Sequence, residues 1–165
     1  MTVQPIQAPL SPFNVFWLLH VVIEMPLGIL AFLAPQELPL YEITPTVVYL
    51  ARSLGALLIA SSVSSLLVFA LPDFLPGKRA FAVQLLLFHA VISAVAFQLD
   101  PRVVRVSLPA FVTDNLPVDE ILEKVPVTYI IGTIHGLLSL LITVWWQATI
   151  PLVKGAAQMA HAKSA

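Results

Sequence analysis

The chain has 165 residues, of which 59% are hydrophobic and only 10% are charged, and its mean hydropathy is +0.94. Soluble domains carry about 25% charged residues, so this composition excludes an ordinary soluble globule. The formal net charge of -1 gives no electrostatic basis for binding nucleic acid, and the absence of cysteine from the sequence excludes disulfide scaffolds and thiol redox chemistry.

Four apolar stretches carry most of the hydrophobicity, and each is long enough to cross a bilayer, which takes about 20 residues. They predict an all-α fold, an integral membrane four-helix bundle, in a single domain that covers residues 1–165. No basic residue precedes the first stretch, as it would in a cleaved signal peptide, so we expect this helix to remain in the mature protein. The expected helices lie at about 13–34, 47–71, 80–98 and 127–153, with a proline-rich loop at 99–126.

The first stretch places two ionisable residues where hydrocarbon penalises them. His20 and Glu24 are four residues apart, so they share one face of a helix within hydrogen-bonding reach. A carboxyl group at this depth must be neutral or be matched by a cation, and such a group suits a general acid or base. We therefore predict that Glu24 donates or accepts a proton and that His20 tunes it.

The second stretch carries Arg52 among small residues such as Gly55 and Ser62, which allow close packing of helices in lipid. Arg52 is expected to orient a substrate, although it also lies near enough to a helix end to extend its side chain to the interface. The loop that follows, at 72–79, is short. It predicts that the second and third helices are antiparallel neighbours.

The third and fourth stretches repeat the four-residue spacing with a histidine and a serine, since His89 precedes Ser93 and His135 precedes Ser139. Counting about 1.5 Å per residue places the ionisable residues of the four helices in a band of about 12 Å around the midplane. Because lipid rejects such groups, we expect them to point toward one another in the bundle centre. His89 and His135 are then candidate catalytic residues, and Ser93 and Ser139 are candidate substrate-binding residues.

The loops and termini give three further expectations. Residues 117–125 have the pattern of a short interfacial helix, and the tail at 154–165 is expected to be short and mobile. Four spans put both termini on one side of the membrane, together with Lys78 and Arg79, whereas most acidic residues fall on the other side. This charge distribution predicts that both termini are cytoplasmic.

A central run, residues 50–97, resembles the core of the small four-helix DoxX-like membrane families. Those families share an arginine followed by a glycine in the second helix, a short basic loop and a polar residue in the third helix. The corresponding positions here are Arg52, Gly55, Lys78, Arg79 and His89. The resemblance covers about a third of the chain and implies a four-helix membrane fold rather than an activity.

The predicted function is acid–base chemistry, such as isomerisation or cyclisation, on a lipophilic terpenoid, sterol or polyketide-like molecule in an intramembrane pocket. Membrane lipid and this molecule are the expected partners, and a homo-oligomer is left open. Two other classes fit the same sequence: a non-catalytic membrane subunit or lipid-binding protein, and a redox protein with quinone, or with haem between His89 and His135. The three histidines and Glu24 are also acceptable zinc or iron ligands, but no HExxH-type doublet occurs in the sequence, and we expect neither a metal nor a cofactor.

Overall fold

The structure, a computed structural model, describes residues 12–40, 42–100 and 126–164. It contains four helical segments long and apolar enough to cross a membrane: Pro12–Leu33, Pro45–Phe69, Pro76–Gln98 and Val127–Ala162. The predicted all-α bundle of a multi-pass membrane protein is therefore confirmed. The interfacial helix expected at 117–125 lies outside the described residues.

Proline and threonine residues set where the helices begin. A short 3-10 turn, η1 (Pro12–Asn14), leads into α1 (Val15–Leu33), and η2 (Pro35–Glu37) follows it. Helices α2 (Pro45–Phe69) and α3 (Pro76–Gln98) each begin with proline, two and four residues before the positions expected from hydropathy. Proline suits a first helical position because its missing N–H would have no partner there. Thr44 also caps α2 by accepting a hydrogen bond from the Val47 backbone N–H at 3.3 Å.

The last part of the chain differs from the prediction. The expected helix at 127–153 is divided into α6 (Val127–Ala148) and α7 (Ile150–Ser164), and α7 includes most of the tail that was expected to be mobile. The division falls just before Pro151, which cannot donate a backbone hydrogen bond and clashes with the preceding turn of a helix. The structure thus gives this part of the tail a helical conformation, which the four alanines in the segment favour.

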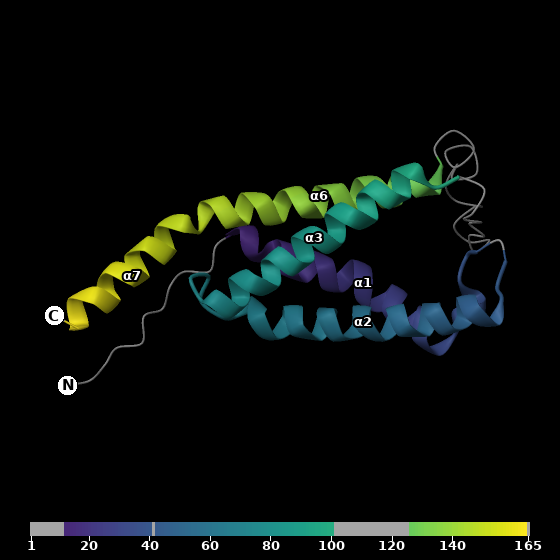
Figure 1. Ribbon diagram of the computed structural model, residues 1–165, viewed down its shortest axis with the longest axis horizontal. Helices are drawn as coiled ribbons and strands as arrows, with labels where there is room; N and C mark the ends of the chain where they lie inside the picture. Colours follow the sequence, from purple (N-terminus) through teal and green to yellow (C-terminus); the bar gives the residue numbers. More distant parts are fainter. Residues whose placement is uncertain (1–11, 41, 101–125, 165) are drawn as a thin grey trace, which may run out of the picture.

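The helices pack as two pairs. Helix α1 packs along α2, and α3 packs along α6, whereas α2 and α3 make few contacts and diverge from their connecting loop (Figure 1). Helices α2 and α3 are therefore antiparallel, as predicted, and adjoin at their connected ends, but they are not packed against each other along their length. Their loop is short, but the closest packing in the bundle lies elsewhere, where a Cβ on Gly55 would approach the Gly28 carbonyl oxygen to 2.7 Å.

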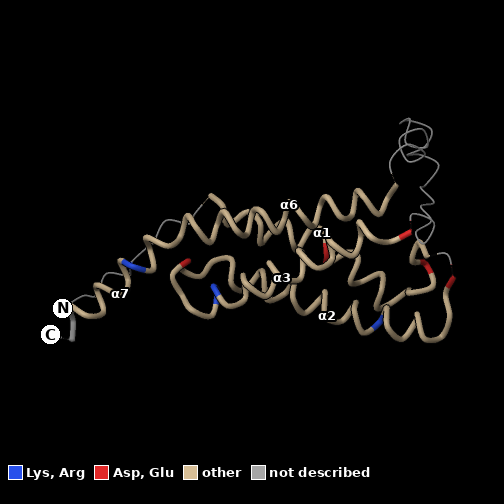
Figure 2. The backbone as a smooth tube through the Cα atoms, turned by 45° about the horizontal axis from the view of Figure 1, so that its top comes forward, with Lys and Arg blue, Asp and Glu red and all other residues tan. Residues whose placement is uncertain are grey.

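A buried ion pair closes the loop between α2 and α3. The Lys78 ammonium lies 2.7 Å from Asp73 Oδ1 and donates hydrogen bonds to the carbonyls of Leu71, at 2.8 Å, and Phe69, at 3.2 Å. The cation thereby satisfies carbonyl groups that the end of α2 leaves open. Charged positions lie mostly toward the ends of the bundle, and an acidic position lies inside it on α1 (Figure 2).

Candidate functional site

Four ionisable side chains from three helices meet in the bundle interior. His20 and Glu24 come from α1, His89 from α3 and His135 from α6, and none of them is more than 6% exposed. The prediction that these groups converge is confirmed. They converge because each lies on the small part of its helix surface that faces other helices, while the remainder faces outward.

The histidines form a hydrogen-bonded chain that continues to α2. His135 Nδ1 lies 2.8 Å from His89 Nδ1, and His89 Nε2 lies 3.1 Å from His20 Nδ1. His20 Nε2 lies 3.2 Å from the hydroxyl oxygen of Ser61. All four long helices therefore contribute to a single polar path through an apolar interior.

The hydroxyl of Ser61 sets the direction of this chain. Its hydrogen is donated to the carbonyl of Leu58 at 3.0 Å, so the oxygen accepts from His20 Nε2–H. A neutral imidazole with one nitrogen donating must accept at the other. His20 Nδ1 therefore accepts from His89 Nε2–H, and His89 Nδ1 accepts from His135 Nδ1–H.

Glu24 lies beside His135 and His89, at the end of the histidine chain that is farthest from Ser61. Its Oε1 is 3.5 Å from His135 Nδ1 and 3.8 Å from His89 Nδ1, and this oxygen makes no hydrogen bond to the described part of the chain. Arg52, which was expected to point toward these groups and orient a substrate, instead lies on an exposed surface of α2. The carboxyl group thus faces two imidazole nitrogens without the expected arginine.

The two predicted substrate-binding serines hold helices together. Ser93 donates a hydrogen bond to the Gly132 carbonyl at 2.7 Å, and Ser139 donates one to the Leu86 carbonyl at 3.0 Å. These bonds run in opposite directions between α3 and α6. Both hydroxyl hydrogens are therefore used in packing this pair of helices.

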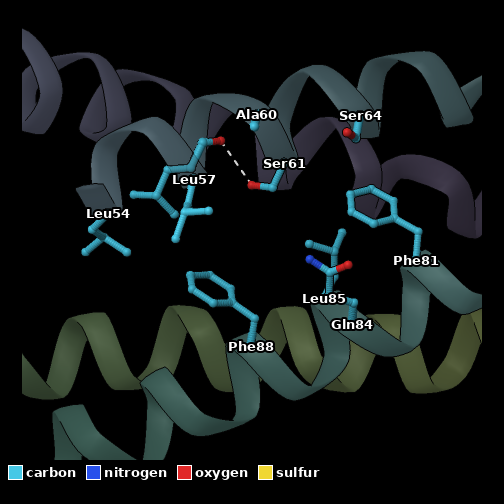
Figure 3. Close-up of a pocket in the computed structure, with 10 residues that line it drawn as sticks. Leu54, Leu57, Ala60, Ser61, Ser64, Phe81, Gln84, Leu85 and Phe88 are labelled. Atoms are coloured by element: carbon cyan, nitrogen blue, oxygen red, sulfur yellow. Dashed lines mark hydrogen bonds between the residues drawn. The ribbon is translucent and has the colours of Figure 1, made fainter. Parts of the chain in front are cut away.

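A cavity of about 380 Å³ lies between the diverging helices α2 and α3. Ser61 is in its wall, opposite the Gln84 amide, and the wall is otherwise mostly apolar (Figure 3). Ser61 therefore connects the cavity to the histidine chain. Sequence reasoning missed this residue because α2 contains several serines, which were all assigned to packing. The available signal was its spacing, since Leu57, Ser61 and Ser64 recur at helical intervals on one face.

Phe88 forms a barrier between the cavity and the histidines. Its ring lines the cavity and lies 5.1 Å from the His89 ring and 6.2 Å from the His135 ring, measured between centroids. These apolar contacts restrict direct access to both histidines. Ser61 is thus the polar residue that the cavity wall and the histidine chain share among the described residues.

The cluster has a donor set that suits a small metal ion but not haem. One ligand atom each from His20, Glu24 and His89 lie within 4.8 Å of one another. Three other atoms, Glu24 Oε1 and the Nδ1 atoms of His89 and His135, are separated by 2.8 Å, 3.5 Å and 3.8 Å. A tetrahedral zinc site needs donors about 3.3 Å apart, which is close to this triangle. A haem needs its two axial nitrogens about 4 Å apart, whereas the facing Nδ1 atoms of His89 and His135 are 2.8 Å apart, so these two atoms do not match an axial pair in this arrangement.

Comparison with known proteins adds no assignment. No protein-family model, no curated protein and no solved structure matches this chain. The resemblance to DoxX-like families therefore stays a prediction, and the functional argument rests on the geometry of the site.

Proposed function

We propose that the protein is a membrane-embedded acid–base catalyst that isomerises or cyclises a lipophilic molecule bound in the cavity between α2 and α3. The observation that carries this proposal is the hydrogen-bonded path from His89, which lies 3.8 Å from the buried Glu24 carboxyl group, through His20 to Ser61 in the cavity wall. Such a path can move a proton between a buried carboxyl group and a substrate without water.

The direction of the hydrogen bonds in the histidine chain indicates how a substrate would be protonated. Glu24 approaches His89 Nδ1 from its resting separation of 3.8 Å to hydrogen-bonding distance and gives it a proton, while His89 passes its Nε2 proton to His20 Nδ1. His20 passes its Nε2 proton to the Ser61 oxygen, and the Ser61 hydroxyl turns from the Leu58 carbonyl to give its own hydrogen to the substrate. Each relay group gains one proton and loses one, so the net change is one proton moved from Glu24 to the substrate.

His135 has a separate role in this mechanism. In the resting structure the single lone pair of His89 Nδ1 accepts from His135 Nδ1–H, so this hydrogen has to turn away before Nδ1 can take the Glu24 proton. That hydrogen can then turn to Glu24 Oε1, which is 3.5 Å away, and stabilise the new carboxylate. The reverse sequence removes a proton from another atom of the substrate, as isomerisation or cyclisation requires, and restores the starting state.

Growth in heavy water tests the proposal whatever the identity of the substrate. Cells that express the wild-type protein should contain a lipophilic product that is an isomer of its precursor and carries one more carbon-bound deuterium, in place of hydrogen, than the precursor does. Glu24→Gln should abolish this product, since the amide keeps the size of the side chain but has no acidic proton to transfer. The purified variant must keep the thermal stability of the wild type, so that loss of folding is excluded. A labelled product in cells that express the Glu24→Gln variant would contradict the proposal.

A metal-dependent reaction is a second candidate, favoured by the triangle of Glu24 Oε1 and the two Nδ1 atoms. His89 and His135 would then bind the ion with Glu24, and His89 would donate its other N–H to His20, as metal-bound histidines commonly do to a neighbouring group. The ion would supply a Lewis acid or an activated water. Stoichiometric zinc or iron in the purified protein, together with activity lost on chelation and restored by the metal, would favour this candidate over the proton relay.

We also propose that both termini lie in the cytoplasm. The support is the position of Lys78, Arg79 and Lys154 on the side of the bundle that carries the termini. If the cavity binds lipid but the cells form no labelled product, the protein is instead a non-catalytic lipid-binding protein.

A further inference from the structure

We propose that the substrate is a flexible single-chain lipid with one oxygen-bearing end, and that it occupies two cavities which follow one another along α2. This inference rests on the proposed function, because it assigns a substrate class to the same site. The first cavity is the one that contains Ser61. The second, of about 300 Å³, lies between α1 and α2, beside the loop that connects them.

The two cavities share a wall. Leu54 and Leu58 line both of them, so the two cavities adjoin at these side chains. Along α2 the lining runs from Ser64 to Val47, a distance of about 25 Å at the helical rise. The two cavities together therefore extend along α2 for a length that an extended chain would fill better than a compact ring system.

The polar lining is confined to one end of this space. Ser61, Ser64 and Gln84 line the first cavity near the end of α2, whereas the second cavity is lined by apolar residues alone. Neither Ser64 nor Gln84 has a hydrogen-bond partner in the part of the chain that the structure describes. Gln84 is an exposed position of the apolar span α3, so its amide faces hydrocarbon and a ligand oxygen that bonds to it is favoured.

These features orient the lipid. Its hydroxyl, carbonyl or carboxyl end lies between Gln84 and Ser61, where the proton relay reaches it, as the facing side chains in Figure 3 indicate. Its apolar chain passes Leu54 and ends near Val47. Flexible terpenoid and polyketide-like chains satisfy this arrangement, and a sterol does not.

A series of prenyl alcohols tests the inference by binding alone. Geraniol, farnesol and geranylgeraniol share the hydroxyl end and differ in the number of isoprene units. Binding to the purified protein in detergent, expressed on the mole fraction of the alcohol in the micelles, should tighten by about threefold or more with each added unit, because each adds packing contacts in the second cavity. Cholesterol at the same mole fraction in the micelles should bind more weakly than farnesol.

Substitutions at the apolar end and at the polar end of the two cavities test the two ends independently. Val47→Trp, or Leu50→Trp if the first variant does not fold, should remove the advantage of geranylgeraniol over farnesol and leave geraniol unchanged. Gln84→Leu should weaken all three alcohols by about the same factor. Leu67→Trp is the matched control, because Leu67 is on α2, is 71% exposed and lines neither cavity, so it should change none of the affinities.

The outcomes distinguish the two proposals. Equal affinity for the three alcohols, or an unchanged length dependence in the tryptophan variants, would overturn the assignment of a chain-like substrate even if labelled product forms. Glu24→Gln should bind the alcohols as the wild type does, because it removes the acid and not the cavity. Normal, length-dependent binding without any labelled product in cells would support the chain-binding site and contradict the proposed catalysis.

Discussion

Ser61 is the residue through which the buried chain reaches the cavity, and its removal is the most direct test of the relay. Ser61→Ala deletes both the oxygen that accepts from His20 and the hydrogen that reaches the substrate. Turnover should fall by about 10²-fold or more, within the range of general acid–base contributions. Stability should change by only about 1 kcal/mol.

Ser53→Ala provides the control for this experiment. Ser53 lies on the same helix and also donates to a backbone carbonyl, that of Tyr49, but it is exposed and lines neither cavity. Its removal should leave turnover unchanged, as measured by the labelled product. Equal activity in the Ser61 and Ser53 variants would reject the relay.

The buried ion pair between Lys78 and Asp73 predicts how the stability of the protein should change when one partner is removed. Lys78→Met leaves Asp73 buried without its cation, and breaking a buried pair in this way costs about 3–5 kcal/mol. Adding Asp73→Asn should recover much of the loss, because neither partner then carries an unpaired charge. Thermal unfolding in detergent measures both effects, and Lys154→Met on α7 should be nearly neutral.

The individual site residues were predictable from the sequence where membrane depth alone selects them. His20, Glu24, His89 and His135 are ionisable groups inside apolar stretches, so hydrocarbon excludes every location except the bundle interior. Serine is tolerated on any face of a membrane helix, because its hydroxyl can bond its own backbone, as Ser61 also does. The role of Ser61 therefore depends on helix rotation, which hydropathy does not determine.

At the scale of the elements, the α1–α2 pair depends on close approach of two backbones. A Cβ at position 55 would lie 2.7 Å from the Phe32 backbone nitrogen, whereas a Cβ at position 77 would meet nothing within 4 Å. Gly55→Ala should therefore force the two helices apart and destabilise the protein by about 1–3 kcal/mol. Gly77→Ala is the matched control and should be neutral or slightly stabilising in the same thermal unfolding experiment.

The helices themselves were more predictable than their pairing. Hydropathy located four spans to within a few residues, because a length of about 20 apolar residues is a strong constraint. The pairing of α1 with α2 and of α3 with α6 depends on details such as Gly55 and the two interhelical serine bonds. Loop length, which suggested that α2 and α3 pack together, limits only the distance between their connected ends.

At the scale of the whole molecule, the proposed orientation can be tested without any background labelling, because the sequence contains no cysteine. Glu42→Cys, in the connection between α1 and α2, should react with a membrane-impermeant maleimide in intact cells. Ala162→Cys, in α7, should react only after the cells are opened. The opposite pattern would place both termini outside the cytoplasm.

The divergence of α2 from α3 also determines how turnover should respond to the membrane. Leu54 and Leu57, in the cavity wall, are 46% and 68% exposed on the surface that acyl chains contact. A substrate that enters there comes directly from the hydrocarbon, so its relevant concentration is its mole fraction in the bilayer. Diluting a fixed amount of substrate with inert phospholipid should therefore slow the reaction, whereas changing the aqueous volume should not.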